Sequence, residues 1–421
     1  MKNSKCSVLL ILTLLGFPEF VLAQESASAP GIVELTLQKA EDLALAGNPH
    51  IRAADDRAYA AGKRVLPALM PGDPSFMYDN STPGMEQLMV EENLGFPGKG
   101  IAQADALGAE AKKAQAMAAD TRLSIVLQAR QAFWEFYYRQ KVDAVLQEAQ
   151  VRWKSLGQIV QSKELSGQWL SIKDIRMQME SAKAVNDLVT NSRALRVSQY
   201  NLNHLFSLPH RTAYKLGSEV VFSEPPSDEE GLVREALEHN PGITVYRRAV
   251  EAQDARHSSA ALDHLPDFNV RLVETKDPAS GQFSEFGFRL GLTVPLFFPA
   301  KQTQALDASS DELLAARYDL KGEQDLVVHM VEDSYVNADS AWRILKLYQE
   351  GGLLKQTQRA WSATQLAYRN EQMSLSDFVE TYNTYLETLT NYYQAQADYG
   401  KALAELEYQT GVLKGDTHEK F

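Results

Sequence analysis

Apolar residues recur every seven positions along two long stretches of this chain that contain no proline. The first stretch follows Phe96-Pro97-Gly98-Lys99 and runs to Pro209, and the second follows Phe298-Pro299-Ala300-Lys301 and runs to Phe421. Because proline costs about 3 kcal/mol inside a helix, such stretches permit very long helices. We expect two long helices in each stretch, and the first helix would reach roughly 100 Å at 1.5 Å per residue.

The seven-residue tracks are typical of coiled-coil seams, so we interpret them as packing positions. The first stretch has an interruption at Arg130 and carries Ala102, Ala109, Ala116, Leu123, Tyr137, Ala144 and Val151. The second has an interruption at Ser334 and carries Leu306, Leu313, Leu320, Val327, Ala341 and Tyr348. The last helix carries Tyr382, Tyr385, Leu389, Tyr392, Tyr399, Leu403 and Leu406. We assign these tyrosines no cofactor role.

Ahead of the second stretch, the pattern changes to strict alternation, which places one set of side chains on each face of a strand. The apolar face of this strand consists of Phe286, Phe288, Leu290, Leu292 and Val294. Residues 266–275 supply a partner strand. Residues 75–80 and 85–94 repeat the hairpin more weakly, with Glu92 on the apolar face. Taken alone, these patterns equally fit a soluble hairpin packed on helices.

Matched landmarks indicate a tandem duplication. Asn48-Pro49 recurs as Asn240-Pro241, where each pair should break an early helix. Phe96-Pro97 recurs as Phe298-Pro299 about 202 residues later. We therefore expect a first repeat at residues 24–208, a connector at 209–230, a second repeat at 231–413 and a tail at 414–421. Each repeat should contain a helix, a β-hairpin and two long helices.

The N-terminus has the pattern of a secretory signal at residues 1–23. Lys2 and Lys5 precede the apolar run Val8–Leu15, and Val21-Leu22-Ala23 offers a cleavage site. The run is too short for a convincing membrane span. The only cysteine, Cys6, precedes this run, whereas a lipid-anchor cysteine should follow it. We predict an exported, non-lipidated protein without disulfides.

Composition and motifs argue against several classes. The formal net charge is −13 and no basic cluster occurs, which argues against nucleic-acid binding. The eight histidines lack zinc-site spacing. Met177 and Met179 face different directions on a helix and fit packing better than a copper site. Gly98-Lys99-Gly100 lacks the Ser or Thr of a phosphate loop. We expect no enzymatic activity, no cofactor and no resident metal.

Four short strands in one exported chain raise a closure problem. The smallest membrane barrels have eight strands, and open edges in lipid leave unpaired backbone groups. The hairpins must therefore stay out of lipid or be completed by other subunits. Three copies would supply twelve strands and a hollow tube of long helices. The rival interpretation is a periplasmic coiled-coil scaffold whose hairpins never enter lipid.

The combined features resemble the outer-membrane efflux protein family, the TolC-like channels, over essentially the whole chain after the signal. The resemblance rests on the duplicated halves, the early Asn-Pro, Leu94-Gly95-Phe96-Pro97-Gly98-Lys99, and the closing segment from Tyr368 to Gly411. It implies a mainly α fold with a small β part. In a homotrimer, the long helices would form a periplasmic α-barrel and the strands a 12-stranded outer-membrane β-barrel. The junction motif and the length are most similar to the heavy-metal efflux branch, which is CzcC/CusC-like.

The resemblance also implies a pore constriction at Asp377 and Glu380. Acidic residues at these positions ring the periplasmic end of family members, and three copies would place six carboxylates around a narrow lumen. Such crowding attracts cations. Both residues lie three apart on one helix face. Without the resemblance, an ordinary solvated helix face is the simpler interpretation.

Three further residues are candidates for supporting this gate. Asp174 lies at the matching bend of the first half, where Met177 stands in place of a second acid. The asymmetry suggests that the second half closes the pore and the first half supports it. Lys173 and Arg369 are the proposed salt-bridge partners of the closed state.

The implied function is the outer-membrane channel subunit of a tripartite, RND-type efflux system, which conducts solutes passively. We expect heavy-metal cations as substrate, with drug efflux or type I secretion as alternatives. The implied partners are two further copies, outer-membrane lipid, an inner-membrane pump and a periplasmic adaptor, the last docking at bend loops 166–171 and 370–376.

Overall fold

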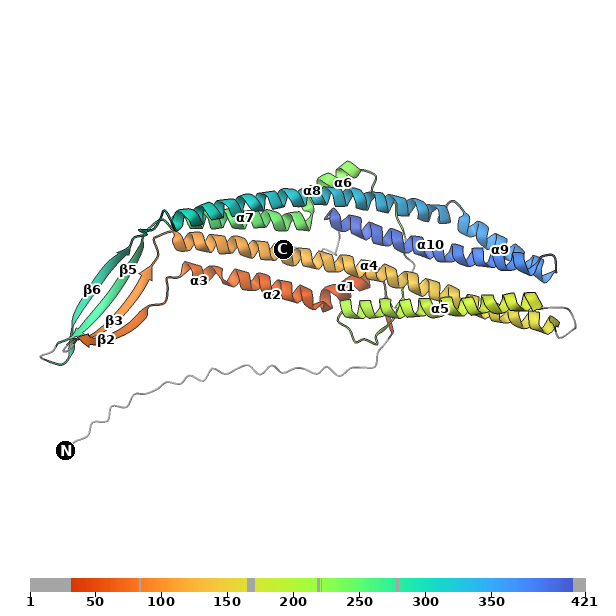
Figure 1. Cartoon of the computed structure of the whole chain (residues 1–421), viewed down its shortest axis with the longest axis horizontal. Helices are drawn as coiled ribbons and strands as arrows, with labels where there is room; N and C mark the ends of the chain where they lie inside the picture. The colour runs from red at the N-terminus through yellow and green to blue at the C-terminus, as the bar shows by residue number, and fades with distance from the viewer. Residues whose placement is uncertain are drawn as a thin grey trace, which may run out of the picture.

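The computed structural model describes residues 32–82, 85–164, 171–217, 220, 222–277 and 280–411. This part of the chain is elongated, with a small curved sheet at one end and long helices running away from it (Figure 1). The predicted signal at residues 1–23 and the predicted tail at 414–421 lie outside the described residues.

The two halves contain helices and strands in the same order. The first half consists of α1 (Leu37–Gly47), α2 (Pro49–Lys63), α3 (Val65–Leu69), β2 (Ser75–Thr82), β3 (Met85–Leu94), α4 (Lys99–Glu164) and α5 (Ser171–Leu205). The second consists of α6 (Glu229–His239), α7 (Pro241–Leu262), β5 (Asp267–Lys276), β6 (Phe283–Thr293), α8 (Gln302–Gln349), α9 (Leu353–Arg369) and α10 (Leu375–Gln409). The predicted positions of the hairpins and of the first long helix are confirmed.

The hairpins of the two halves form one antiparallel sheet in the order β2-β3-β5-β6. The pairing of β3 with β5 joins the halves, with Val90 opposite Leu272. In the described part of the chain, β2 and β6 each have one edge without a partner strand. The sheet therefore ends in two open edges.

Each Asn-Pro pair separates two helices, as predicted, and also ties its half together. The side chains of Asn48 and Asn240 accept hydrogen bonds from the first turn of the following helix, at 2.9 and 3.1 Å. Their amide groups donate to the carbonyls of Leu205 and Gln409, at 3.0 and 2.7 Å. These carbonyls lie at the ends of α5 and α10, so each asparagine joins the start of its half to the end. Sequence reasoning did not predict this second bond.

The prediction of two long helices after the second hairpin was wrong, because that segment forms three. α8 ends at Gln349 and α9 begins at Leu353. Gly352 has a φ of 70°, a left-handed conformation that glycine adopts without a Cβ penalty. A Cβ on Gly351 would lie 2.6 Å from the carbonyl oxygen of Leu347. The two glycines therefore place a bend inside the expected helix.

The seven-residue track of α4 also fails at its C-terminal end. Ala144 and Val151 are exposed, whereas Val142, Ala149 and Trp153 are buried. A straight helix has 3.6 residues per turn and drifts away from a strict seven-residue repeat. Over 66 residues the drift carries the end of the predicted track off the contact face.

A second, two-stranded sheet was not predicted. β1 (Ile32–Leu35) pairs in parallel with β4 (Ala213–Leu216), which lies inside the predicted connector. Four-residue strands are too short to produce a clear alternation pattern. The four predicted strands are therefore those of the large sheet, and the two strands of the small sheet were not predicted.

The largest apolar cluster lies where α4 meets α1, α5 and α10. Trp134 is 3% exposed, and its ring packs edge-on against Phe133 and Tyr137 at 5.4 Å. Gly400 of α10 makes room for this ring, because a Cβ there would lie 2.0 Å from a carbon of Trp134. α4 and α10 can therefore approach closely only with glycine at this position.

Polar bonds accompany this apolar contact between α4 and α10. They join Tyr137 to Gln396 (2.9 Å), Lys401 to Glu135 (2.6 Å), Gln131 to Glu405 (3.1 Å) and Arg130 to Glu407. Burial by itself raises the pKa of Glu135, but hydrogen bonds from Lys401 and Arg139 outweigh it. The net pKa lies below the usual 4.5. These bonds join the first half to the second.

Gly400→Ala should destabilise the protein by about 1–3 kcal/mol, the usual cost of overpacking a core. The matched control is Gly108→Ala in α4, where an added Cβ has no atom within 4 Å. The control should stabilise by about 0.5–1 kcal/mol, because alanine favours the helix. Thermal unfolding in detergent measures both. Equal effects of the two substitutions would contradict the close approach.

The depressed pKa of Glu135 predicts a pH-dependent contribution to stability. This contribution is present above pH 4.5 and is lost as the pH falls through the lower pKa of the folded state. Glu135→Gln should therefore flatten the decline in unfolding temperature below pH 4.5. Glu238→Gln on the exposed side of α6 is the control. A variant that declines with pH as steeply as the wild type would refute the prediction.

Candidate functional site

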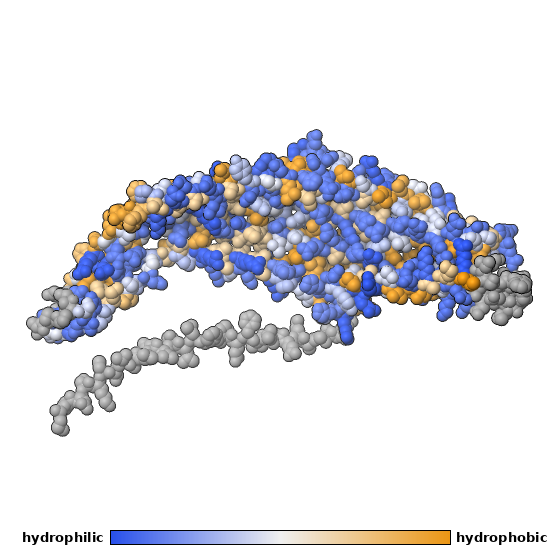
Figure 2. All heavy atoms as spheres, in the orientation of Figure 1, coloured by the Kyte–Doolittle hydropathy of each residue, from blue (hydrophilic) through white to orange (hydrophobic). Residues whose placement is uncertain are grey.

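One face of the large sheet is apolar. Residues opposite each other in neighbouring strands share a face, so the register sorts the side chains. The predicted row on β6 shares its face with Phe76, Tyr78, Leu88, Val90, Leu94, Phe268, Val270 and Leu272. Phe286 and Leu290 are each 72% exposed, and Val294, just after β6, is 53% exposed. Hydrophobic residues gather at the junction of sheet and helices (Figure 2). An exposed patch of this kind is a typical interaction surface.

The opposite face of the sheet is largely polar, apart from one apolar row of Met77, Met89 and Val273. Arg271 donates to Glu91 at 2.6 Å, and Asn269 donates to Asn93 at 2.8 Å. These bonds cross between β3 and β5, and therefore between the two halves. The alternation of apolar and polar faces is typical of strands that separate lipid from water.

Two acids are exceptions on the apolar face. Glu92 pairs with Val270 near the helix end of the sheet, and Glu274 pairs with Phe286 near the hairpin turns. The next polar row is beyond Glu274, where Lys276 and Glu86 form an ion pair at 2.7 Å. The two acids therefore lie in different rows of the apolar face, and the row of Val90, Leu272 and Phe288 between them is uncharged.

The predicted constriction residues lie at the opposite end of the molecule. α9 and α10 form a helical hairpin whose turn spans residues 370–374. Ser374 begins α10 by accepting a hydrogen bond from the backbone N–H of Asp377 at 3.2 Å. Asp377 and Glu380 are both exposed on one face of α10, while Phe378 and Val379 between them are buried. The geometry therefore presents both carboxylates to solvent at the tip.

Aromatic packing holds this tip together. Trp361 of α9 stacks on Tyr382 at 4.4 Å and on Tyr385 at 5.8 Å, with ring planes inclined by 27° and 17°. Tyr368 packs against Phe378 at 4.5 Å. The buried side of α10 is thereby fixed, and with it the direction in which Asp377 and Glu380 point.

The described structure locates the side chain of only one of the three predicted gate supports. Arg369 is exposed at the end of α9 and forms no ion pair with Asp377 or Glu380. Lys173 and Asp174 lie in the first turn of α5, but their side chains are outside the described part of the structure. No contact of these two side chains is therefore assigned.

Two contacts between α5 and α10 were missed. Arg176 donates to Ser376 at 2.9 Å, and Asn383 donates to Glu180 at 3.3 Å. Both bonds join the first half to the second beside the predicted constriction. The spacing of about 200 residues between Arg176 and Ser376, close to the repeat offset, is the signal that could have suggested this pairing.

Acidic residues continue along the exposed side of α10. Asp377, Glu380, Glu387 and Asp398 are exposed at helical spacing. The only basic residue of α10 is Lys401, which pairs with Glu135. The exposed side of α10 therefore carries uncompensated negative charge.

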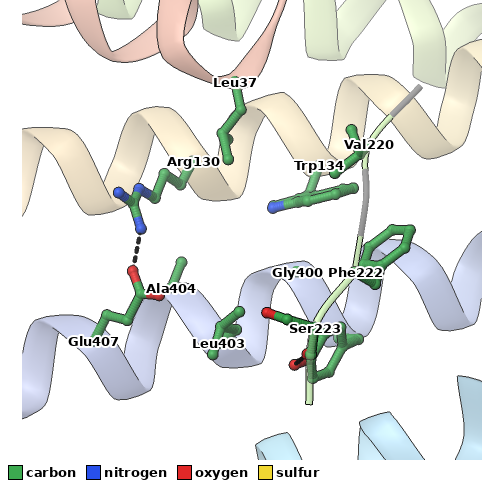
Figure 3. A pocket seen from close by; sticks show the side chains of 11 residues that line it. Leu37, Arg130, Trp134, Val220, Phe222, Ser223, Gly400, Leu403, Ala404 and Glu407 are labelled. Atoms are coloured by element: carbon green, nitrogen blue, oxygen red, sulfur yellow. Dashed lines mark hydrogen bonds and ion pairs between the residues drawn. The ribbon is translucent and has the colours of Figure 1, made fainter. Parts of the chain in front are cut away.

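A partly open pocket of about 110 Å³ lies between α4 and α10 (Figure 3). Arg130 pairs there with Glu41 at 2.7 Å and also with Glu407. Burial raises the pKa of Glu41, although Arg130 opposes this shift. Tyr399 donates to the carbonyl of Ser223, and burial raises the pKa of Tyr399 to about 12. The polar groups named here are satisfied internally, so the pocket is a packing feature rather than a candidate binding site.

Within residues 32–411, where they are described, no cluster of three or more His, Cys, Asp or Glu could hold a metal ion.

None of the helices in the described ranges is both long and apolar enough to cross a membrane.

Comparisons with known proteins agree on the fold. Residues 232–412 match the family model described as outer membrane efflux protein. No curated protein sequence matches the chain. The solved outer membrane channel CmeC of Campylobacter jejuni is 15% identical, with a TM-score of 0.75 over 93% of this chain and 90% of that one.

Two further solved structures have the same fold at similarly low identity. The outer membrane protein VceC of Vibrio cholerae is 16% identical, with a TM-score of 0.72 over 89% of this chain and 96% of that one. CusC, described as forming a transmembrane channel, is 13% identical, with a TM-score of 0.73 over 92% of this chain and 95% of that one.

The family model covers the second half, and the structural likeness extends to the first half, whose elements follow the same order. Proteins of this family are transport channels rather than enzymes, and they act in tripartite efflux. Residues 232–412 match the outer membrane efflux protein family, and the chain has the fold of solved outer membrane channels over about nine-tenths of its length.

Proposed function

We propose that three copies of this chain form one pore, with a twelve-stranded barrel in the outer membrane and a helical tunnel in the periplasm. The observation that carries the proposal is a sheet with one apolar face, one polar face and two open edges. Four strands are too few for a barrel, since the smallest have eight. Three copies supply twelve strands and remove every edge.

The helices fit the same assembly. α4 has 66 residues and would extend roughly 100 Å at 1.5 Å per residue. Each copy contributes two similar halves, at residues 24–208 and 231–413, so three copies place six similar units around one axis. A tube of this length would cross a large part of the periplasm.

We assign the constriction to Asp377 and Glu380 at the tip of the α9–α10 hairpin. Their exposure on one face and the fixed aromatic packing behind them support this assignment. Six carboxylates around a narrow lumen would repel one another and attract cations. Arg369, Lys173 and Asp174 are the proposed groups that stabilise the closed state from neighbouring helices.

The passively conducted substrate in this proposal is a heavy-metal cation. The uncompensated acids along α10 support a cationic cargo. Drug efflux and type I secretion are the alternatives. The exposed turn at residues 370–374 and the matching bend of the first half would contact a periplasmic adaptor, which joins the channel to an inner-membrane RND-type pump.

Leu290→Asp should block assembly in the outer membrane, because it places a second charge in the row of the apolar face that already contains Glu92. The control, Arg289→Asp, puts the same residue one position away on the polar face and should assemble. Heat-modifiable migration of outer-membrane fractions on gels measures assembly. Normal assembly of Leu290→Asp would favour a periplasmic scaffold and overturn the barrel.

The pair Asp377→Ala and Glu380→Ala should raise single-channel conductance in planar bilayers and weaken block by divalent and trivalent metal cations several-fold. The control pair is Glu235→Ala and Glu238→Ala, which removes the same charges at the same spacing from α6. The control should leave both properties unchanged. Unaltered conductance and block in the first variant would reject the constriction.

A further inference from the structure

We propose that Lys301 of one copy forms an ion pair with Asp73 of the next copy at the junction between sheet and helices. This inference rests on the trimeric channel proposed above and identifies the contact that sets the register between copies. The argument starts from the equivalent junction inside one chain, which the structure shows in full.

Within the chain, Lys99 joins the two halves at the base of the sheet. Its Nζ donates to the carbonyl of Leu265 at 2.7 Å and to Oδ1 of Asp267 at 2.9 Å. The same Oδ1 accepts the backbone N–H of Phe96 at 3.0 Å. Gly98, with a φ of 104°, turns the chain from β3 into α4 and brings Lys99 to this position. The lysine side chain is 17% exposed.

The second half carries a related motif, with Ala300 in place of Gly98, and lacks this contact. Phe298-Pro299-Ala300-Lys301 follows β6 as Phe96-Pro97-Gly98-Lys99 follows β3. Lys301 is exposed, and it forms no ion pair with any described residue. No strand lies beside β6 on its outer side in the described chain, so this second junction lacks its counterpart.

The hairpin registers identify the missing counterpart. Val90, six residues before Phe96, pairs with Phe76, and Leu292, six residues before Phe298, pairs with Phe268. Phe76 of β2 is therefore equivalent to Phe268 of β5.

We apply this equivalence to the contact between copies. β2 of the next copy then pairs with β6 in the same register in which β5 pairs with β3. Asp73, Pro74 and Ser75 then occupy the positions that Leu265, Pro266 and Asp267 occupy within the chain. Lys301 reaches the backbone at Asp73, where a carboxylate is available.

The sequences differ in where the acid lies. Within the chain, the carboxylate belongs to Asp267, and its equivalent on β2 is Ser75. The acid of the next copy is Asp73, two residues before Ser75. Asp73 is equivalent to Leu265, whose carbonyl accepts the hydrogen bond from Lys99. Asp73 is exposed and forms no ion pair within the described residues. The opposite charges are therefore retained at the junction.

An aromatic pair supports the same register. Phe96 stacks on Phe268 at 6.1 Å within the chain. The equivalent pair is Phe298 with Phe76 of the next copy. Phe298 is 52% exposed and Phe76 is 76% exposed, whereas Phe268 is 39% exposed. Both unpaired rings would gain a partner from the contact that joins Lys301 to Asp73.

The direct test is cross-linking of Asp73→Cys/Lys301→Cys in isolated outer membranes with a short bismaleimide. The only native cysteine is Cys6, in the predicted signal, so the two new thiols are the targets. We expect covalent dimers and trimers on denaturing gels. The control pair, Asp73→Cys/Gln282→Cys, should give none, because Gln282 lies at the far end of β6, roughly 35 Å away at 3.3 Å per residue.

The outcomes separate this inference from the proposed function. A protein that migrates as a trimer before heating, yet gives no more cross-linking at 73/301 than at 73/282, would overturn the ion pair and leave the channel intact. A protein with no trimer at all would overturn both. Charge exchange gives an independent readout. Asp73→Lys and Lys301→Asp should each lower the heat resistance of the trimer, and the double variant should restore it. A double variant no better than the single variants would refute the pairing.

Discussion

The main constraint on this structure is that the backbone N–H and C=O groups along the outer edges of β2 and β6 need hydrogen-bond partners. A strand edge in lipid leaves N–H and C=O groups without partners, and each costs several kcal/mol. Within the described chain, β3 and β5 are paired along both edges, whereas β2 and β6 are paired along one edge each. In the proposed trimer, strands of neighbouring copies pair with the remaining two edges. The exposed apolar face of the sheet is a second constraint, because contact between these side chains and water is unfavourable.

The strand-to-helix junction transmits the arrangement of the sheet to the helices. Lys99 and Asp267 fix the end of β3 against the start of β5, and α4 leaves the sheet directly from this point. Farther along, the Asn-Pro asparagines tie the early helices to the ends of α5 and α10. Bonds from Glu135 and Arg130 then join α4 to α10. Contacts within and between the halves thus run from the sheet along the long helices.

Sequence alone predicted the four strands of the large sheet and most helices because their signals are local. The alternation around Leu290 and the absence of proline after Lys99 act through backbone geometry within each segment. The bend at Gly352 was missed because the apolar repeat on both sides of Gly351 and Gly352 suggested one continuous helix. The exposed position of Val151 was missed because the drift of a 66-residue helix depends on which neighbours it contacts.

The site was predicted less completely than the fold. The exposure of Asp377 and Glu380 follows from helical spacing, but their role in a constriction came from family resemblance. The contact between Arg176 and Ser376 depends on two segments meeting in space, which periodicity cannot indicate. The role of Lys99 was equally hidden, since its partner lies 168 residues away in the other half.

Hydrogen exchange at the backbone amides of β6 in membrane-embedded protein tests the central claim most directly. If neighbouring copies complete the sheet, amides from Phe286 to Leu292 should exchange as slowly as those from Phe268 to Glu274 in β5, which is paired on both sides. Rapid exchange at alternate positions of β6, beside full protection of β5, would mean that the edge stays open and would contradict the account.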